Sequence, residues 1–296
     1  MATCASNAGK PLVAAKTHQG KTTPNERSGA FTAVILAGSR RADDPVASVF
    51  GYQYKALVPI AGQPMVSRVV DALVASKSVK SIVIVFDNSE SLYASCPELL
   101  IAADKVEISV ISCGTSICDS LANVIKTTGT SWPYLVTTAD HALLTPQMVD
   151  EFCTDAFGKS GLAVGLVEKK YLDAKHPNSK RTYLPFRETD LSGANLFAFM
   201  QPQAMNAIEF WRKVERKRKK PWKLFAAFGW INFLGFLMKR FTVDQAFDRA
   251  SVRLGASVRA IRLPYAEAAI DVDSPKDFVQ VSEILENRAQ SIPVPV

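Results

Sequence analysis

The sequence has few cysteines and no pair in C-x-x-C spacing. Its five cysteines are Cys4, Cys96, Cys113, Cys118 and Cys153. An odd number without a framework excludes the disulfide scaffold of a small secreted domain, so we expect free thiols in a reducing compartment such as the cytoplasm. Cys113 and Cys118 match no metal-binding spacing, and buried thiols are the simpler interpretation.

Long apolar runs are also absent. No run reaches the roughly 18 residues that a membrane-spanning helix requires. Residues 1–30 hold only short apolar pieces, show no signal peptide and are rich in Ala, Thr, Ser, Lys and Gly. We therefore expect residues 1–30 to form a mobile tail and residues 31–290 to form a single domain.

Positive charge is unevenly distributed along the chain. The net charge is +7, and residues 212–223, "RKVERKRKKPWK", carry eight Lys or Arg and one Glu. This one run therefore accounts for the whole net charge. A single basic patch does not by itself indicate a nucleic-acid-binding protein.

Apolar runs alternate with amphipathic segments up to about residue 167. Strands are predicted at 31–37, 81–86, 106–112, 133–138 and 161–167, and helices at 64–77, 116–127 and 145–157. The strands are almost continuously apolar and rich in Val and Ile, as expected for strands buried on both faces. This alternation predicts an α/β fold, with a Rossmann-like, mixed but mostly parallel sheet covered by helices on both faces.

The pattern becomes less regular after residue 168. Residues 168–193 are polar and predict a long loop or an inserted flap. A short strand at 194–199 and a basic and apolar helical insertion at about 203–250 are predicted to follow. A strand is predicted at 258–263 and a helix from about residue 275. Ser274, Pro275 and Asp277 supply the N-cap, N1 and N3 signals of that helix.

A glycine and two arginines directly follow the first predicted strand, in "ILAGSRR" (residues 35–41). In open parallel sheets, ligands bind at the carboxyl ends of the strands. Backbone amides of a glycine loop can approach phosphates, and arginine binds phosphate oxygens with two donors. The stretch predicts a polyphosphate-binding loop, although an ordinary glycine turn explains it equally well.

Four motifs in order carry a family resemblance. They are "ILAGSRR", "KALVPIAGQPMVSRVVDAL" (55–73), "TTADHALLTPQMVDEF" (137–152) and "AIDVDSPKDF" (269–278). Together they resemble the MobA-like nucleotidyltransferases, which have a glycosyltransferase-A-type fold. The resemblance covers about 31–167 and 255–287. The second glycine of the family loop is missing here, so the identity of the nucleotide stays open.

The resemblance implies transfer of NMP from an NTP to a phosphorylated acceptor, with release of pyrophosphate. The acceptor would be a sugar, polyol, lipid head-group or cofactor phosphate. The first loop, Leu36, Ala37, Gly38 and Ser39, would bind the nucleotide. Either Arg40 or Arg41 matches the family's phosphate-binding arginine.

Lys55 matches the family lysine and would stabilise charge developing on the α-phosphate. The alternative is a surface lysine whose stem packs on apolar neighbours.

Two aspartates are the candidate metal ligands. Asp140 follows a predicted buried strand, and Asp273 aligns with the family's second metal aspartate. Both are predicted at strand ends, where they would hold Mg²⁺ or, in its place, Mn²⁺. A turn aspartate is the alternative for Asp140. His141 and Asp271 are candidate substrate contacts, and Asp271 is expected to face the same side as Asp273.

A second loop and a later motif complete the candidate site. The family resemblance places Gly114, Thr115, Ser116 and Ser120 against the nucleotide base, and Asn195 of "SGAN" (192–195) near the acceptor.

Residues 212–238 are the least family-like part. A polybasic run meets fifteen largely apolar residues, 224–238, with Trp222 and Trp230 near their ends. This pattern is typical of a segment that lies on an anionic membrane surface, here the inner face of the membrane. Burial in the protein's own core or in a homo-oligomer interface also fits. Nucleic acid is the poorer account, because no nucleic-acid-binding motif accompanies the patch.

Two other functions remain to be weighed. A scaffold protein that binds nucleotide without turnover would dock on membranes through 212–238, but it would not need Lys55, Asp140 and Asp273 together. A glycosyltransferase would need a central D-x-D triplet, whereas "DVD" (271–273) comes late in the chain.

Overall fold

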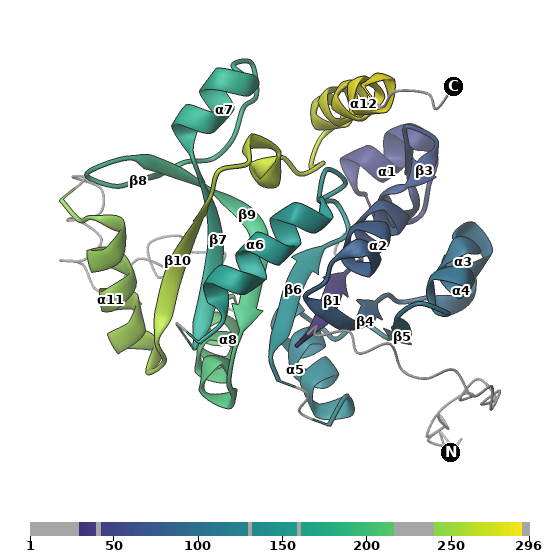
Figure 1. The fold of residues 1–296 in the computed structure, drawn as a ribbon. Coiled ribbons are helices and arrows are strands. Elements are labelled where there is room, and N and C mark those ends of the chain that lie inside the picture. Colours follow the sequence, from purple (N-terminus) through teal and green to yellow (C-terminus); the bar gives the residue numbers. More distant parts are fainter. Residues whose placement is uncertain (1–29, 40–42, 130–131, 159–160, 216–239, 292–296) are drawn as a thin grey trace, which may run out of the picture.

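The centre of the molecule is an eight-stranded, mostly parallel sheet (Figure 1). The computed structural model describes residues 30–39, 43–129, 132–158, 161–215 and 240–291. The strand order is β10-β7-β9-β6-β1-β4-β5, with β8 paired to β9. Its strands are β1 (Phe31–Leu36), β4 (Val79–Val85), β5 (Glu107–Ile111), β6 (Tyr134–Thr138), β7 (Leu162–Glu168), β8 (Leu184–Pro185), β9 (Asp190–Phe199) and β10 (Val258–Leu263); β2 (Pro59–Ile60) and β3 (Gln63–Pro64) form a separate pair. The fold class predicted from the sequence is confirmed.

The apolar runs of the sequence form the inner strands. The predicted strands at 31–37, 81–86, 106–112, 133–138, 161–167 and 258–263 are confirmed to within two residues at each end. Val34 and Ile35 of β1 are both fully buried, and they belong to core clusters on opposite faces of the sheet. A strand covered on both faces needs apolar side chains at every position, which explains the unbroken runs.

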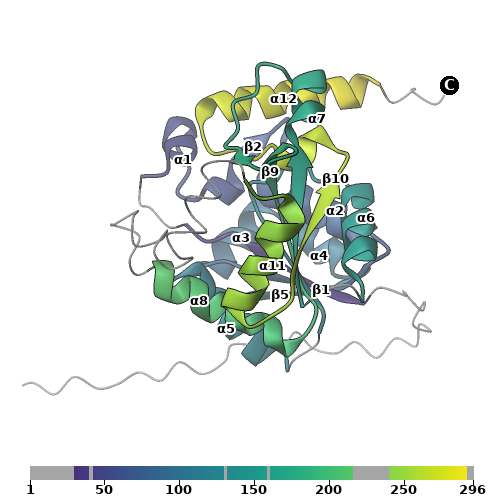
Figure 2. The same ribbon diagram turned by 90° about the vertical axis from the view of Figure 1, so that its left-hand side faces the viewer.

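Helices cover both faces of this sheet, and Figure 2 shows the layers from the side. The core on one face includes residues of α2 and α6, and the core on the other includes residues of α5 and α8. The helices are α1 (Pro45–Phe50), α2 (Met65–Ala75), α3 (Ser89–Ser95), α4 (Glu98–Ala102), α5 (Ile117–Thr127), α6 (Pro146–Ala156), α7 (Lys169–Lys175), α8 (Met205–Glu215), α11 (Val243–Leu254) and α12 (Pro275–Gln290), with short 3-10 helices η1 (Lys55–Leu57), η2 (Pro202–Ala204) and η3 (Ala266–Ala269).

The predicted helix start signals form caps in the structure. The Thr145 hydroxyl accepts a hydrogen bond from the backbone N–H of Met148 at the start of α6. At the start of α12 the Ser274 hydroxyl accepts one from the backbone N–H of Asp277, and Pro275 occupies the first position. Each cap satisfies a helix N–H that has no partner within the helix, so these two boundaries are encoded locally.

Residues 168–193 differ from the sequence prediction. The expected long loop is wrong, because this segment contains α7, β8 and the first part of β9. The expected short strand at 194–199 is the second half of β9, a ten-residue strand lying antiparallel between β6 and β7. Helix α7 buries Leu172 and carries an exposed Lys169–Asp173 ion pair of 2.8 Å, so its composition resembles that of a loop.

Two predicted segments lie outside the described residues. They are nearly all of the tail at 1–30 and most of the membrane-contact segment at 212–238, from residue 216 onward. Of the predicted insertion at 203–250, the structure describes α8 and α11. No helix in the described ranges is both long and apolar enough to cross a bilayer.

Helix α2 follows η1, which carries Lys55, and the β2–β3 pair, and its packing is testable. Leu73 of α2 is fully buried, so Leu73→Ala should lower the free energy of unfolding by about 2–5 kcal/mol in urea denaturation. Leu100 of α4 is 60% exposed. Leu100→Ala is the matched control, with an expected loss below about 0.5 kcal/mol. Equal losses from both variants would contradict the packing described here.

Candidate active site

The carboxyl ends of three neighbouring strands meet at one edge of the sheet. Strand β1 pairs in parallel with both β4 and β6. Just past the strand ends, the backbone N–H of Ala37 donates to Val85 O (3.0 Å), and that of Ala139 donates to Leu36 O (3.1 Å). These bonds hold the loop after β1 beside the segment that carries Asp140.

The ammonium of Lys55 lies at the centre of this edge. Its Nζ is 2.5 Å from Asp140 Oδ2 and 3.1 Å from Asp273 Oδ1, and it donates to Val272 O at 2.9 Å. An ammonium has three N–H groups, and here each has an acceptor. The Lys55 side chain is 19% exposed, so this is a held charge and not a surface lysine.

Burial and the two carboxylates act in opposite directions on Lys55. Burial lowers the pKa of Lys55, but the charges and hydrogen bonds of Asp140 and Asp273 outweigh it, and the pKa is raised above its usual value. Lys55 therefore stays positively charged throughout the neutral range.

The two candidate metal ligands differ in their surroundings. Asp140 Oδ1 is buried and has no hydrogen-bond partner among the described residues, whereas the side chain of Asp273 is 69% exposed. The prediction that Asp273 lies at a strand end is wrong. It lies in an irregular segment between η3 and α12, ten residues beyond β10. The backbone N–H of Val272 donates to Asp140 O (3.1 Å), which brings this segment to the site.

Asp271 and Asn195 lie together beside Lys55's partners. Asn195 Nδ2 donates to Asp271 Oδ2 at 2.9 Å, and Arg181 Nη1 donates to Asp271 Oδ1 at 2.7 Å. Burial, followed by the charges of Asp273 and Asp140, raises the pKa of Asp271. The Asn195 backbone has φ of 49°, a left-handed conformation that is uncommon outside glycine. Both oxygens of Asp271 are thus engaged within the protein.

The two predicted nucleotide-binding loops touch at Gly38. A Cβ on Gly38 would lie 2.3 Å from Cys113 Sγ, so only glycine fits without displacing the thiol. Burial, followed by a hydrogen bond to Asp87 and its charge, raises the pKa of Cys113 to about 12. Cys113 is therefore a neutral packing group here, and Gly38 and Ser39 are exposed at the end of β1.

The loop of residues 113–121 is held by its own polar side chains. The Gly114 N–H donates to Ser120 Oγ at 2.8 Å, and the Ser116 hydroxyl caps α5 by accepting from the Asp119 N–H. Thr115 Oγ1 also donates to the Asp119 carboxylate. A Cβ on Gly114 would lie 2.7 Å from Ser120 N, which explains the glycine. These hydroxyls therefore hold the loop in shape.

A basic residue outside this loop also contacts it. Arg212 of α8 is the first residue of the basic run, and its Nη2 lies 2.9 Å from Asp119 Oδ1. No local sequence pattern predicts this pair, because the two residues are 93 positions apart.

The structure places the remaining candidates as follows. Leu36 ends β1 and Ala37 is buried directly after it. Arg40 and Arg41 lie outside the described residues.

Sequence reasoning missed Arg181 and Asp87. Arg181 lies in the segment that was expected to be a loop, and no motif includes it. No group of three or more His, Cys, Asp or Glu within the described ranges is arranged to hold a metal by itself.

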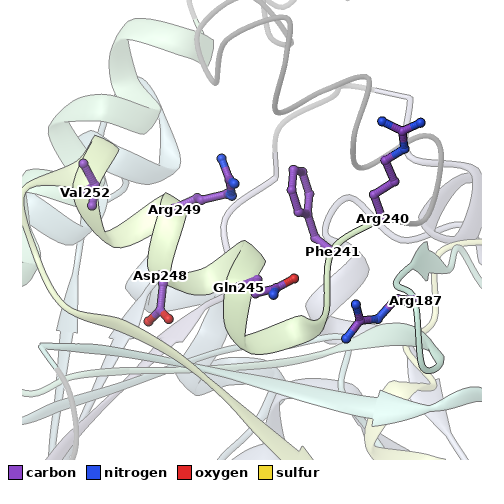
Figure 3. A pocket seen from close by; sticks show the side chains of 7 residues that line it. All are labelled: Arg187, Arg240, Phe241, Gln245, Asp248, Arg249 and Val252. Atoms are coloured by element: carbon purple, nitrogen blue, oxygen red, sulfur yellow. The ribbon is translucent and has the colours of Figure 1, made fainter.

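A separate cavity of about 520 Å³ lies against α11 and shares no residue with this cluster (Figure 3). Its lining includes Arg187, Arg240 and Arg249, whose side chains point in different directions in Figure 3. The cavity has neither the lysine nor the paired carboxylates of the first site, so the candidate active site is the Lys55 cluster.

The contact between Gly38 and Cys113 is testable by complementation. Gly38→Ala should weaken NTP binding at least about fivefold, because the new methyl displaces either the loop or the thiol. Cys113→Ala removes Sγ and leaves only Cβ, 3.5 Å from the new methyl. The double variant should therefore recover most of the affinity, as measured by calorimetry. Equal NTP affinity in Gly38→Ala and in the Gly38→Ala/Cys113→Ala double variant would contradict a direct clash.

His141 gives a prediction for stability against pH. Complete burial lowers its pKa from 6.5 to about 4, and the Asp140 charge and the Glu267 backbone offset only part of this effect. The unfolded chain therefore binds the proton more readily, and stability is lost as the pH falls below 6.5. Between pH 7 and pH 5 this group should cost about 2 kcal/mol. In urea denaturation, His141→Asn should therefore lose about 2 kcal/mol less stability than wild type between pH 7 and pH 5. The same dependence of unfolding free energy on pH in both proteins would contradict this role of His141.

Comparisons with known proteins identify the family of this chain. The profile of the MobA-like NTP transferase domain matches residues 33–177. A hypothetical transferase structure from Thermus thermophilus is 30% identical, with a TM-score of 0.70, and the alignment covers 84% of this chain and 99% of that one. No curated protein matches the sequence.

Two further solved structures share the fold at low identity. A CMP:2-keto-3-deoxy-manno-octonic acid synthetase complexed with CTP is 13% identical, with a TM-score of 0.55, covering 88% of this chain and 100% of that one. A 4-diphosphocytidyl-2C-methyl-D-erythritol synthase from Anaerococcus prevotii is 11% identical, with a TM-score of 0.50, covering 87% and 99%. These two structures show the fold alone. The domain match and the 30% identical structure carry the identification: the chain belongs to the MobA-like NTP transferase domain family and is a nucleotidyltransferase.

Proposed function

We propose that this protein transfers NMP from an NTP to a phosphorylated small molecule in a Mg²⁺-dependent reaction. The observation that carries the proposal is the Lys55 ammonium, which bridges Asp140 and Asp273 at the carboxyl edge of the sheet. A positive charge and two carboxylates converge there from three separate parts of the sequence. The exposed glycine loop after β1 lies at the same edge.

The reaction needs alignment and charge neutralisation more than covalent help. An oxygen of the acceptor phosphate attacks the α-phosphorus of the NTP. The bond from that phosphorus to the bridging oxygen of the β-phosphate breaks, and pyrophosphate leaves with the electron pair. Lys55 would stabilise the negative charge that develops on the α-phosphate oxygens during this exchange.

The donor set fits Mg²⁺, or Mn²⁺ in its place. Mg²⁺ takes one or two protein carboxylates and completes its shell with phosphates and water. Asp140 and Asp273 would hold it, and the buried, unpartnered Oδ1 of Asp140 has an unused acceptor. When bound, the ion would neutralise triphosphate charge and orient the phosphates.

The two loops would hold the nucleotide. The backbone amides at Gly38 and Ser39 would bind phosphate oxygens, and the edge of the loop at Gly114 would face the base. Arg40 or Arg41 remains the predicted partner of the β- and γ-phosphates. Asn195 and Asp271 would line the acceptor side, since they lie next to the metal ligands.

Pyrophosphate release tests this function. The protein is mixed with Mg²⁺, each of ATP, CTP, GTP and UTP, and a panel of sugar, polyol, head-group and cofactor phosphates. Lys55→Met and Asp140→Asn should each lower kcat at least about 100-fold, because each removes a charge placed at the reacting phosphates. The matched controls are Lys80→Met and Asp104→Asn, which change exposed residues and should keep wild-type kcat.

The assay also separates the proposal from its alternatives. Tight NTP binding without turnover on any acceptor would favour a nucleotide-binding scaffold. Turnover that survives Asp140→Asn would contradict the assigned site. The prediction that residues 212–238 contact an anionic membrane is tested by adding vesicles with and without anionic lipid to the same assay.

A further inference from the structure

Arg181 is a buried, hydrogen-bonded cation beside the site, and the proposed reaction does not use it. Its side chain is only 7% exposed. All three of its guanidinium nitrogens donate to protein acceptors: Nε to Ser179 Oγ (3.2 Å), Nη1 to Asp271, and Nη2 to the Asp277 carboxylate. It also lies beyond residues 33–177, the part of the chain that the family profile matches.

The partners of Arg181 lie at both ends of one short segment. At the near end, Nη1 binds both the backbone oxygen of Asp271 (3.2 Å) and its carboxylate (2.7 Å). At the far end, Nη2 binds Asp277 in the first turn of α12. The residues between them include Val272 and Asp273, which contact Lys55. One guanidinium thus connects both ends of the segment that supplies two of the three hydrogen-bond acceptors of Lys55.

Asp273 depends on this segment for its position. Its side chain is 69% exposed, and its Oδ1 lies 3.1 Å from Lys55 Nζ. A carboxylate that is so open has little packing around it to fix its place. The position of Asp273 is therefore set by the backbone on either side, which Arg181 anchors directly.

Two further contacts hold the same segment. Asn195 binds the second carboxylate oxygen of Asp271 from β9, in a left-handed backbone conformation that the surrounding structure must stabilise. Ser179, which accepts from Arg181, donates to Gln280 of α12 at 3.1 Å. Residues 176–183, which connect α7 to β8, are thus joined to the Lys55 cluster through side-chain contacts centred on Arg181.

From this geometry we infer that Arg181 is a positioning residue of the transferase site. By fixing both ends of residues 271–277, it places the Asp273 carboxylate and the Val272 carbonyl at the Lys55 ammonium. It does not touch the substrate or the reacting phosphates. The expected effect on kcat rests on the proposed function, whereas the role of Arg181 in placing Asp273 does not.

The test compares wild type with Arg181→Ala, Arg181→Lys and a matched control. Arg259 also forms an ion pair with an aspartate, Asp248, but on the exposed surface of β10 and α11. Arg259→Ala should therefore behave as wild type. Mn²⁺ binding is measured by electron paramagnetic resonance without nucleotide, and kcat and KM by pyrophosphate release. Added guanidinium chloride, at millimolar concentration, tests for chemical rescue.

Arg181→Ala should weaken Mn²⁺ binding about tenfold or more, as expected when a support of a metal-binding carboxylate is lost. Its kcat should fall with little change in the KM of the NTP, and guanidinium ion should restore part of both losses. Arg181→Lys keeps the positive charge but cannot contact both ends of residues 271–277. Its Mn²⁺ affinity and kcat should therefore lie between those of wild type and Arg181→Ala. If Arg181→Ala does not fold, the Arg181→Lys comparison decides the question.

Wild-type Mn²⁺ affinity and kcat in both Arg181 variants would overturn the inference. A loss of kcat that guanidinium does not rescue, accompanied by a matching loss of thermal stability, would also overturn it in favour of a merely structural role. Failure of the proposed function has a different signature: the wild-type protein would release no pyrophosphate with any NTP and acceptor, while Arg181→Ala would still bind Mn²⁺ more weakly.

Discussion

The arrangement of the site depends on one ammonium held between two carboxylates. Without Lys55, Asp140 and Asp273 would face each other with no counter-charge, and Asp140 is largely removed from solvent. Breaking a partly buried pair by removing one partner leaves an uncompensated charge, which costs far more than an exposed pair contributes. The loop before α2, the end of β6 and the segment before α12 must therefore meet at one point.

The sheet topology makes this meeting feasible. Parallel pairing places the ends of β1 and β6 side by side, which fixes Asp140 near the glycine loop. Asp273 arrives by a different route, because β10 ends ten residues earlier and an irregular segment carries the chain back across the edge. The backbone bond from Val272 to Asp140 O joins this segment to the sheet. The regular and irregular parts of the fold thus contribute one carboxylate each.

The sequence predicted the parts of the molecule whose causes are local. Unbroken apolar runs mark buried strands, and the caps at Thr145 and Ser274 act within a single turn. The same reasoning failed between 168 and 193, where α7 is short and charged and β9 is defined by pairing with distant strands. Arg181 was missed for a similar reason, since its partners lie 90 and 96 residues away. A lone arginine in a polar stretch gives no local signal of such contacts.

The charges around the cluster also constrain what it can bind. Among the described residues of this cluster, two cations, Lys55 and Arg181, pair with four carboxylates, so these six groups carry a net charge of −2. A triphosphate alone would be repelled by this surplus. A triphosphate that arrives with a divalent cation would not be repelled, because the cation cancels the surplus negative charge. The coordination positions that the protein leaves open on the cation accept phosphate oxygens. Under the proposed function, the backbone amides at Gly38 and Ser39 would contact phosphate oxygens without adding charge, and Arg40 or Arg41 of the same loop would add positive charge.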